Sequence, residues 1–182
     1  MTLIVETGLG NSAAESYISV AEADIYHEKF NNVNWAIIDD ALKEGYLRQA
    51  TFFMLGRYRM RWLGRRVLIT QALDWPRVGV VLEDFGGGQG RSGMGSYGLF
   101  QVLYTIVPLE VKYACAELAL RASVGPLLAD QQQKVLMETV GPVSVKYDEQ
   151  SPQSVRFVQV DELVRVYLLA GGNQSSLRLI RS

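Results

Sequence analysis

Apolar residues recur at the spacing of an α-helix in residues 108–124, and this periodicity constrains the fold more than any other feature. Pro108 suits the first turn of a helix, Glu110 suits its positive end, and Gly125 stops it. The segment therefore predicts a helix of the core. Its buried face is expected to carry Val111, Cys115, Leu118 and Ala122.

Three other segments show helical signals. Ser19 and Glu22 form a capping-box pattern that begins a helix at about 20–30. A longer helix is predicted over about 39–58, where an aspartate can cap the start, and a last helix fits about 158–170. One face of the longer helix is expected to carry Leu42, Tyr46, Ala50 and Phe53.

Residues 134–141 and 142–147 predict a β-hairpin, because the second run alternates apolar and polar side chains. Residues 66–70 and 78–82 indicate short extended pieces. The sequence therefore predicts a mostly α fold, a small helical bundle with one β-hairpin and long flexible extensions.

The extensions divide the predicted domain. We expect a single domain over residues 1–170, with an extended N-terminal arm at 1–16 and a glycine-rich loop at 86–98, and a C-terminal tail at 171–182. The loop has seven glycines in thirteen positions, which is typical of a mobile segment. The total length of 182 residues agrees with one domain, at about 150 residues per domain.

Composition excludes several classes of protein. One cysteine cannot form an internal disulfide framework or a cysteine zinc cluster, and one histidine leaves little metal or general-base chemistry. No apolar stretch approaches the roughly 18 residues of a membrane span, and the first residues lack the basic region of a secretory signal. We therefore expect a chain compatible with a reducing cytoplasm, with no metal, no cofactor and no membrane partner.

Enzyme motifs lack the context that they need. The pattern G-x-G-x-x-G occurs within residues 88–98, but an apolar run follows it instead of a capped helix, so no phosphate-binding loop is predicted. His27 stands beside Glu28 in a predicted helix, and no nucleophile-elbow motif is present. We expect no catalytic residues and no enzyme activity.

Charge is distributed in opposed blocks. Residues 1–44 hold eight acids and two bases, whereas residues 48–77 hold seven arginines and one acid, so local charges of −6 and +6 lie within a total of −1. Two interpretations stay open. The blocks could join neighbouring copies of the chain, or they could pair inside one copy.

Residues 52–66 interleave arginines with aromatic residues, which is typical of a surface that binds single-stranded nucleic acid. In the competing interpretation, the aromatic residues belong to the core and the arginines pair with acids of a neighbouring subunit. The near-neutral total charge favours the second interpretation. The candidate partner- or DNA-facing residues are Arg57, Arg59, Arg61, Arg65 and Arg66, and the candidate core residues are Phe53, Trp62, Trp75, Pro76, Cys115 and Leu118.

Several motifs carry a family resemblance. Residues 61–66 read Arg-Trp-Leu-Gly-Arg-Arg, residues 71–77 read Gln-Ala-Leu-Asp-Trp-Pro-Arg, and residues 138–145 read Glu-Thr-Val-Gly-Pro-Val-Ser-Val. With these motifs the chain resembles a tailed-bacteriophage family labelled DnaT-like single-stranded DNA-binding proteins. In organisation it also resembles phage head–tail adaptors, which are helical with a β-hairpin and flexible extensions.

The two resemblances imply different functions. The adaptor resemblance implies a structural ring, typically dodecameric, that extends the DNA channel between portal and tail. Its partners would be other copies of the chain, the portal protein, tail or tail-completion proteins and transient DNA. It would lie in the host cytoplasm before assembly and at the head–tail junction of the virion afterwards. The DnaT-like resemblance implies a replication or priming factor that binds single strands. The balanced charge favours the adaptor as the expectation.

Overall fold

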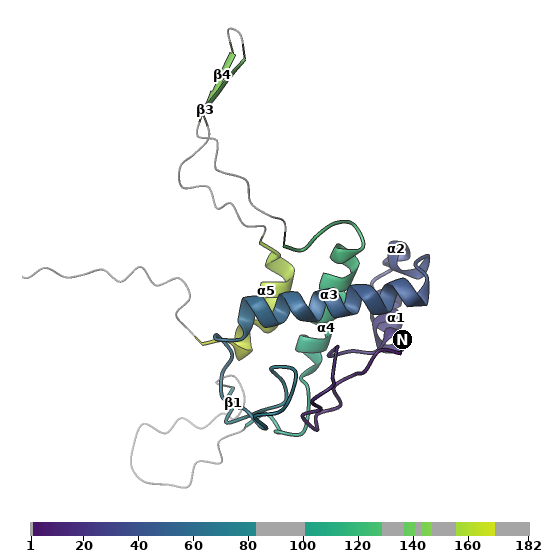
Figure 1. Cartoon of the computed structure of the whole chain (residues 1–182), viewed down its shortest axis with the longest axis vertical. Helices are drawn as coiled ribbons and strands as arrows, with labels where there is room; N and C mark the ends of the chain where they lie inside the picture. Colours follow the sequence, from purple (N-terminus) through teal and green to yellow (C-terminus); the bar gives the residue numbers. More distant parts are fainter. Residues whose placement is uncertain (1, 83–100, 129–136, 141–142, 147–155, 170–182) are drawn as a thin grey trace, which may run out of the picture.

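The computed structural model describes residues 2–82, 101–128, 137–140, 143–146 and 156–169. Most of the described chain is helical (Figure 1). The elements in chain order are α1 (Val20–Lys29), α2 (Val33–Ala36), α3 (Asp40–Tyr58), β1 (Arg65–Arg66), β2 (Arg77–Val78), α4 (Leu109–Ala122), β3 (Met137–Val140), β4 (Val143–Lys146), α5 (Val158–Val164) and the 3-10 helix η1 (Arg165–Tyr167).

The core lies where α3 crosses α4 and where α4 meets α5 (Figure 1). Leu47 and Met54 of α3 are wholly buried, and so are Val160 and Val164 of α5. The predicted face of α4 is confirmed, because its four residues are all buried. Pro108 stands at the N-cap of α4 and Glu110 in its first turn, as the sequence pattern indicates.

The capping box of α1 is confirmed. The Ser19 hydroxyl accepts the Glu22 amide at 3.2 Å, and the Glu22 carboxylate accepts the Ser19 amide at 3.1 Å. The short helix α2 was not predicted from the asparagines around it. It buries Trp35, whose indole N–H donates to Asp24 at 2.7 Å.

The bounds predicted for α3 are confirmed, but its predicted face is wrong at Leu42. Leu42 is 55% exposed, Tyr46 is partly buried against the core, and Lys43 is only 5% exposed. Lys43 lies in the interior because its ammonium pairs with Asp24 at 3.0 Å and lies 5.8 Å from the centre of the Trp35 ring. A periodicity based on apolar residues alone cannot place a lysine on a buried face.

Residues 2–16 do not form the extended arm that the sequence indicated. The Glu6 side chain is wholly buried and accepts three backbone amides, from Gly8 at 2.8 Å, Gly10 at 2.9 Å and Asn11 at 2.7 Å. The Glu6 amide donates to the Ser16 carbonyl at 2.9 Å, which closes the segment on itself. The Glu6 carboxylate therefore stabilises a compact loop, whose backbone bonds to residues of the same segment.

Three loop segments meet below α3 in Figure 1, and we call them together the loop end. It comprises residues 2–12, 59–82 and 101–107. Strands β1 and β2 pair antiparallel, with Arg65 opposite Val78, and an isolated bridge joins Val81 to Gln101. The Ala72 amide donates to the Asn11 carbonyl at 3.2 Å. These backbone contacts join all three segments.

Strands β3 and β4 form the predicted hairpin, in a register that sets Met137 opposite Lys146 and Val140 opposite Val143. The mostly α fold with a β-hairpin is thus confirmed. The predicted last helix is shorter than expected, because α5 passes into the 3-10 turn η1 at Arg165. The glycine-rich loop 86–98 and the tail 171–182 lie outside the described residues. No helix among those described is long and apolar enough to cross a membrane.

Candidate nucleic-acid interface

The arginines of residues 48–77 divide into two groups in the structure. Three of them are held by the protein itself. Arg48 pairs with Glu15 at 3.1 Å and with Glu44 at 3.3 Å, and Arg59 pairs with the buried Asp74 at 2.9 Å. The third, Arg77, is buried, and its hydrogen bonds within the described residues go to backbone carbonyls.

Arg77 fastens the loop end from inside. Its guanidinium donates to the carbonyls of Leu63 at 2.7 Å, Gly64 at 2.8 Å and Asp74 at 3.1 Å. Burial lowers the pKa of Arg77, although the nearby Asp74 carboxylate acts in the opposite direction. The guanidinium supplies donors to carbonyls that strand pairing leaves free. Its role is structural.

The other four arginines are Arg57, Arg61, Arg65 and Arg66. Among the residues that the structure describes, none of the four makes an ion pair. Three are exposed, and Arg61 is partly exposed with its guanidinium 5.9 Å from the centre of the Tyr58 ring. Arg66 donates to the Gln71 carbonyl at 3.3 Å and keeps its charge uncompensated. Within the described residues, no carboxylate compensates these four positive charges.

The acidic block does not neutralise this group. Of the arginines in 48–77, only Arg48 pairs with acids of residues 1–44 in the described chain. Most other acids of the block have partners of their own: Glu22 pairs with Lys112 at 2.7 Å, and Asp24 pairs with Lys43. The interpretation that the acidic and basic blocks pair inside one copy therefore holds for Arg48. Among the described residues it does not hold for Arg57, Arg61, Arg65 or Arg66.

The aromatic residues of the stretch are mostly core residues. Phe53, Tyr58 and Trp62 are 5%, 1% and 3% exposed, so their rings are not available to bases. Phe52 points outward from α3 and is 71% exposed. The structure also places Trp75, Pro76, Cys115 and Leu118 in the interior, with a cis peptide bond between Trp75 and Pro76.

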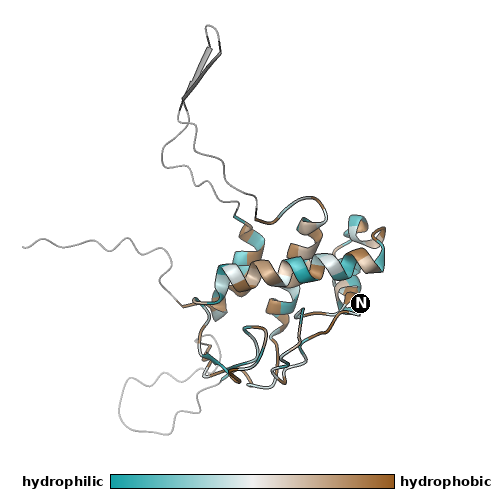
Figure 2. Cartoon of the chain, viewed as in Figure 1, coloured by the Kyte–Doolittle hydropathy of each residue, from teal (hydrophilic) through white to brown (hydrophobic). Residues whose placement is uncertain are grey.

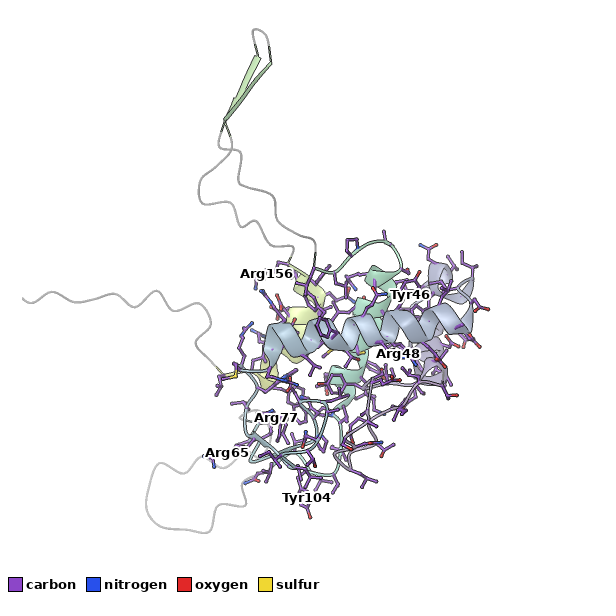
Figure 3. All side chains as sticks on the ribbon, in the orientation of Figure 1. Tyr46, Arg48, Arg65, Arg77, Tyr104 and Arg156 are labelled. Carbon is purple, nitrogen blue, oxygen red and sulfur yellow. The ribbon has the colours of Figure 1, made fainter. Side chains whose placement is uncertain are left out.

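The surface charge of the loop end is positive. Its described residues include two acids, Glu6 and Asp74, and both carboxylates are wholly buried. Arg65, Arg66 and Tyr104 lie at this end of the molecule (Figure 3 labels Arg65 and Tyr104). The exposed ring of Tyr104 was missed from the sequence, because residues 101–107 read as a plain apolar run.

Cys115 and His27 are both buried. Burial raises the pKa of the Cys115 thiol, which lies 3.4 Å from the Thr51 hydroxyl and 3.9 Å from the Ser16 hydroxyl. His27 is buried between Asn32 and the Ala116 carbonyl. In the parts of the chain that the structure describes, no three His, Cys, Asp or Glu side chains are grouped to hold a metal ion.

These features define a helical protein that exposes four arginines without a carboxylate partner in the described chain, the chemistry of an anion-binding surface. The chain belongs to the family described as "Putative DnaT-like ssDNA binding protein", whose pattern it matches over residues 1–182. Searches of curated proteins and of solved structures find no match.

The family match corrects the expectation of a head–tail adaptor. The description names single-stranded DNA as the ligand, and nothing in it refers to a portal, a tail or a ring. The expected partners inside a virion are therefore withdrawn, and DNA is the partner that the comparison supports. The total charge misled the interpretation, because among the described residues no carboxylate pairs with Arg57, Arg61, Arg65 or Arg66.

Proposed function

We propose that this protein binds single-stranded DNA, with Arg57, Arg61, Arg65 and Arg66 as the phosphate-contacting residues. The observation that carries the proposal is that these four arginines lie exposed or partly exposed without a carboxylate partner in the described chain. Family membership adds support, because the family is described by single-stranded DNA binding. The proposal assigns no catalytic step and no cofactor to the chain.

Phosphate contacts of this kind would be independent of base sequence. An arginine that neutralises a phosphate releases a condensed counterion, so affinity arises largely from the salt-dependent release of ions. The guanidinium also matches phosphate with two parallel donors, which lysine cannot do. Priming of replication, which the resemblance to DnaT implies, is the process in which we place this binding.

The test compares two double variants that remove the same charge. We expect Arg65→Gln with Arg66→Gln to weaken binding of a fluorescently labelled oligothymidylate by at least about tenfold at low salt, because two phosphate contacts are lost. The matched control, Lys29→Gln with Arg156→Gln, removes two exposed cations of α1 and of the segment before α5. Fluorescence anisotropy measures both.

The control variant is expected to bind within about twofold of the wild type. Equal loss in both double variants would mean that net charge alone governs binding, which contradicts the assignment of Arg65 and Arg66. An unaltered wild-type protein that fails to bind oligothymidylate even at low salt would contradict the proposed function itself. Circular dichroism would establish that both variants keep the helical fold.

A further inference from the structure

Exposed apolar side chains gather at the loop end, beside the unpaired arginines. Ile69 is 90% exposed and Tyr104 is 57% exposed, and Figure 2 shows hydrophobic and hydrophilic stretches together in the loops around β1. A group of apolar residues in water is unfavourable unless a partner covers it. The exposed large apolar residues of the loop end are Ile4, Leu9, Met60, Leu68, Ile69, Val78, Leu103, Tyr104 and Ile106.

The backbone holds Tyr104 in a defined position. The Val102 amide donates to the Val80 carbonyl at 2.9 Å, and the Ile106 amide donates to the Leu103 carbonyl at 3.3 Å. On the other side Gly8 approaches so closely that a Cβ there would collide with the Thr105 carbonyl oxygen. An exposed ring on a loop fixed at both flanks loses little conformational freedom on binding.

Tyr104 is also close to the arginines along the backbone framework. Val78 pairs with Arg65, and Val81 pairs with Gln101. Val78 and Val81 are three residues apart, which spans no more than about 11 Å even when fully extended. Gln101 and Tyr104 are also three residues apart, with the same upper limit of about 11 Å. Arg65 and Tyr104 both lie at the loop end (Figure 3), so a strand of several nucleotides could contact both.

We infer that Tyr104 is a base-stacking residue, which receives an unpaired base while Arg65 and Arg66 hold neighbouring phosphates. The inference rests on the proposed function and assigns the surface that reads single strands. The charge of the loop end indicates which ligand it binds. The loop end exposes arginines and its two described acids are buried, so it fits a polyanion with unpaired aromatic bases, which is single-stranded nucleic acid.

Phe52, the exposed ring within residues 52–66, fits this role less well. Phe52 lines a groove of about 660 Å³ along α3, together with Glu15 and Arg48. Arg48 is already paired with Glu15, which lines the groove with it, and with Glu44, so the positive charge of its guanidinium is compensated there. A phosphate next to Phe52 would meet negative charge, whereas a phosphate next to Tyr104 would meet arginines.

Stacking on Tyr104 would make binding selective for single strands. Bases of a duplex are stacked on each other and cannot cover the ring, whereas the arginines can hold phosphates of either form. The phosphate contacts and the ring therefore have separable effects. Removal of the ring should reduce the preference for single strands, and removal of the arginines should weaken both.

The experiment measures binding of a labelled oligothymidylate and of a duplex by fluorescence anisotropy. We expect Tyr104→Ala to weaken single-strand binding about 5- to 150-fold and to leave duplex binding within about twofold. Tyr104→Phe should keep the wild-type affinity, because the ring remains. The matched control Phe52→Ala should bind both forms like the wild type.

A direct readout of stacking uses Tyr104→Trp. The three native tryptophans are at most 3% exposed, so the introduced indole would be the exposed fluorophore. Oligothymidylate should quench its emission, and the duplex should not. A wild-type affinity in Tyr104→Ala, together with a loss in Arg65→Gln with Arg66→Gln, would overturn the inference and leave the proposed function standing.

Two other outcomes would also overturn it. Loss of single-strand affinity in Phe52→Ala instead would place the base on α3. A change of oligomeric state in Tyr104→Ala, measured by analytical ultracentrifugation with DNA affinity unaltered, would identify the apolar group as a contact between protein copies. Failure of the wild type to bind any oligonucleotide would instead remove the proposed function, and the inference with it.

Discussion

At the scale of single residues, burial and partners decide what each charged side chain can do. Seven arginines of similar sequence context become a buried clamp, two ion-paired residues and four available cations. Their number and the block of positive charge could be predicted from the sequence. The pairing of each arginine with a carboxylate could not be predicted. Arg59 and Asp74, for example, are separated by a loop whose path the sequence does not define.

The buried histidine gives a prediction about pH. The Ala116 carbonyl accepts from His27 Nε2 at 3.1 Å, and Asn32 Nδ2 donates to Nδ1 at 3.0 Å, which fixes the neutral ring. Burial lowers the pKa of His27, and the positive charge of Lys43 lowers it further. The hydrogen bond to the Ala116 carbonyl and the charges of Glu117 and Asp24 raise it, but burial has the largest effect. The histidine of the unfolded chain has a pKa of about 6.5, so as the pH falls it is protonated before His27 of the folded protein.

The contribution of neutral His27 to the free energy of unfolding should thus be fully present above about pH 7. It should be lost as the pH drops below about 6.5, by up to about 1.4 kcal/mol per pH unit. His27→Gln should flatten this fall between pH 7 and 5.5, since the chain has one histidine. Urea denaturation of both proteins at several pH values measures the difference. A fall that persists unaltered in the variant would assign it to other groups.

At the scale of elements, the helices were more predictable than the loops. Local signals define α1, α3 and α4: caps at Ser19 and Asp39, a proline before Leu109, and apolar periodicity. The loop end depends instead on contacts between distant segments, such as Val81 with Gln101. Neither its compact N-terminal segment nor the exposed position of Tyr104 has a local signature, so the candidate site was predicted only through its arginines.

Gly8 provides a test of how tightly these loops meet. Its φ of 101° lies in the left-handed region, and a Cβ would collide with the Thr105 carbonyl oxygen. We expect Gly8→Ala to lower the free energy of unfolding by more than about 2 kcal/mol, since strain and a backbone collision add. Thermal and urea denaturation measure the loss.

Gly79→Ala is the matched control, because Gly79 has a φ of 75° and open space around it. It should cost only the backbone strain, about 1 kcal/mol. If the two variants are equally destabilised, the close approach between Gly8 and Thr105 contributes nothing, and the loop end is looser than the structure indicates.

At the scale of the whole molecule, the net charge of −1 hides a local positive surface. Most acids of the described chain take part in helix caps, ion pairs or buried hydrogen bonds, whereas four arginines have no carboxylate partner there. A chain that is nearly neutral overall can therefore bind a polyanion at one end. Total charge is a poor guide when opposed charges are segregated by the fold.

The salt dependence of binding gives the number of phosphates that are neutralised. If all four arginines make contacts, the logarithm of the association constant should fall against the logarithm of salt concentration with a slope of about −3. The Arg65→Gln with Arg66→Gln variant should reduce the slope to about half. A slope near zero in the wild type would mean that ion release plays no part, which contradicts the phosphate contacts.

The buried Glu6 carboxylate limits how nucleic acid can be held. Successive backbone amides that converge on one point make a ready receptor for a phosphate oxygen in many proteins. Here the chain fills that receptor with its own acid, so an incoming strand finds those donors occupied. Under the proposed function, recognition at this described loop is then left to side chains. Affinity for DNA can then be raised or lowered by evolution or by design through surface substitutions, without rebuilding the main chain beneath them.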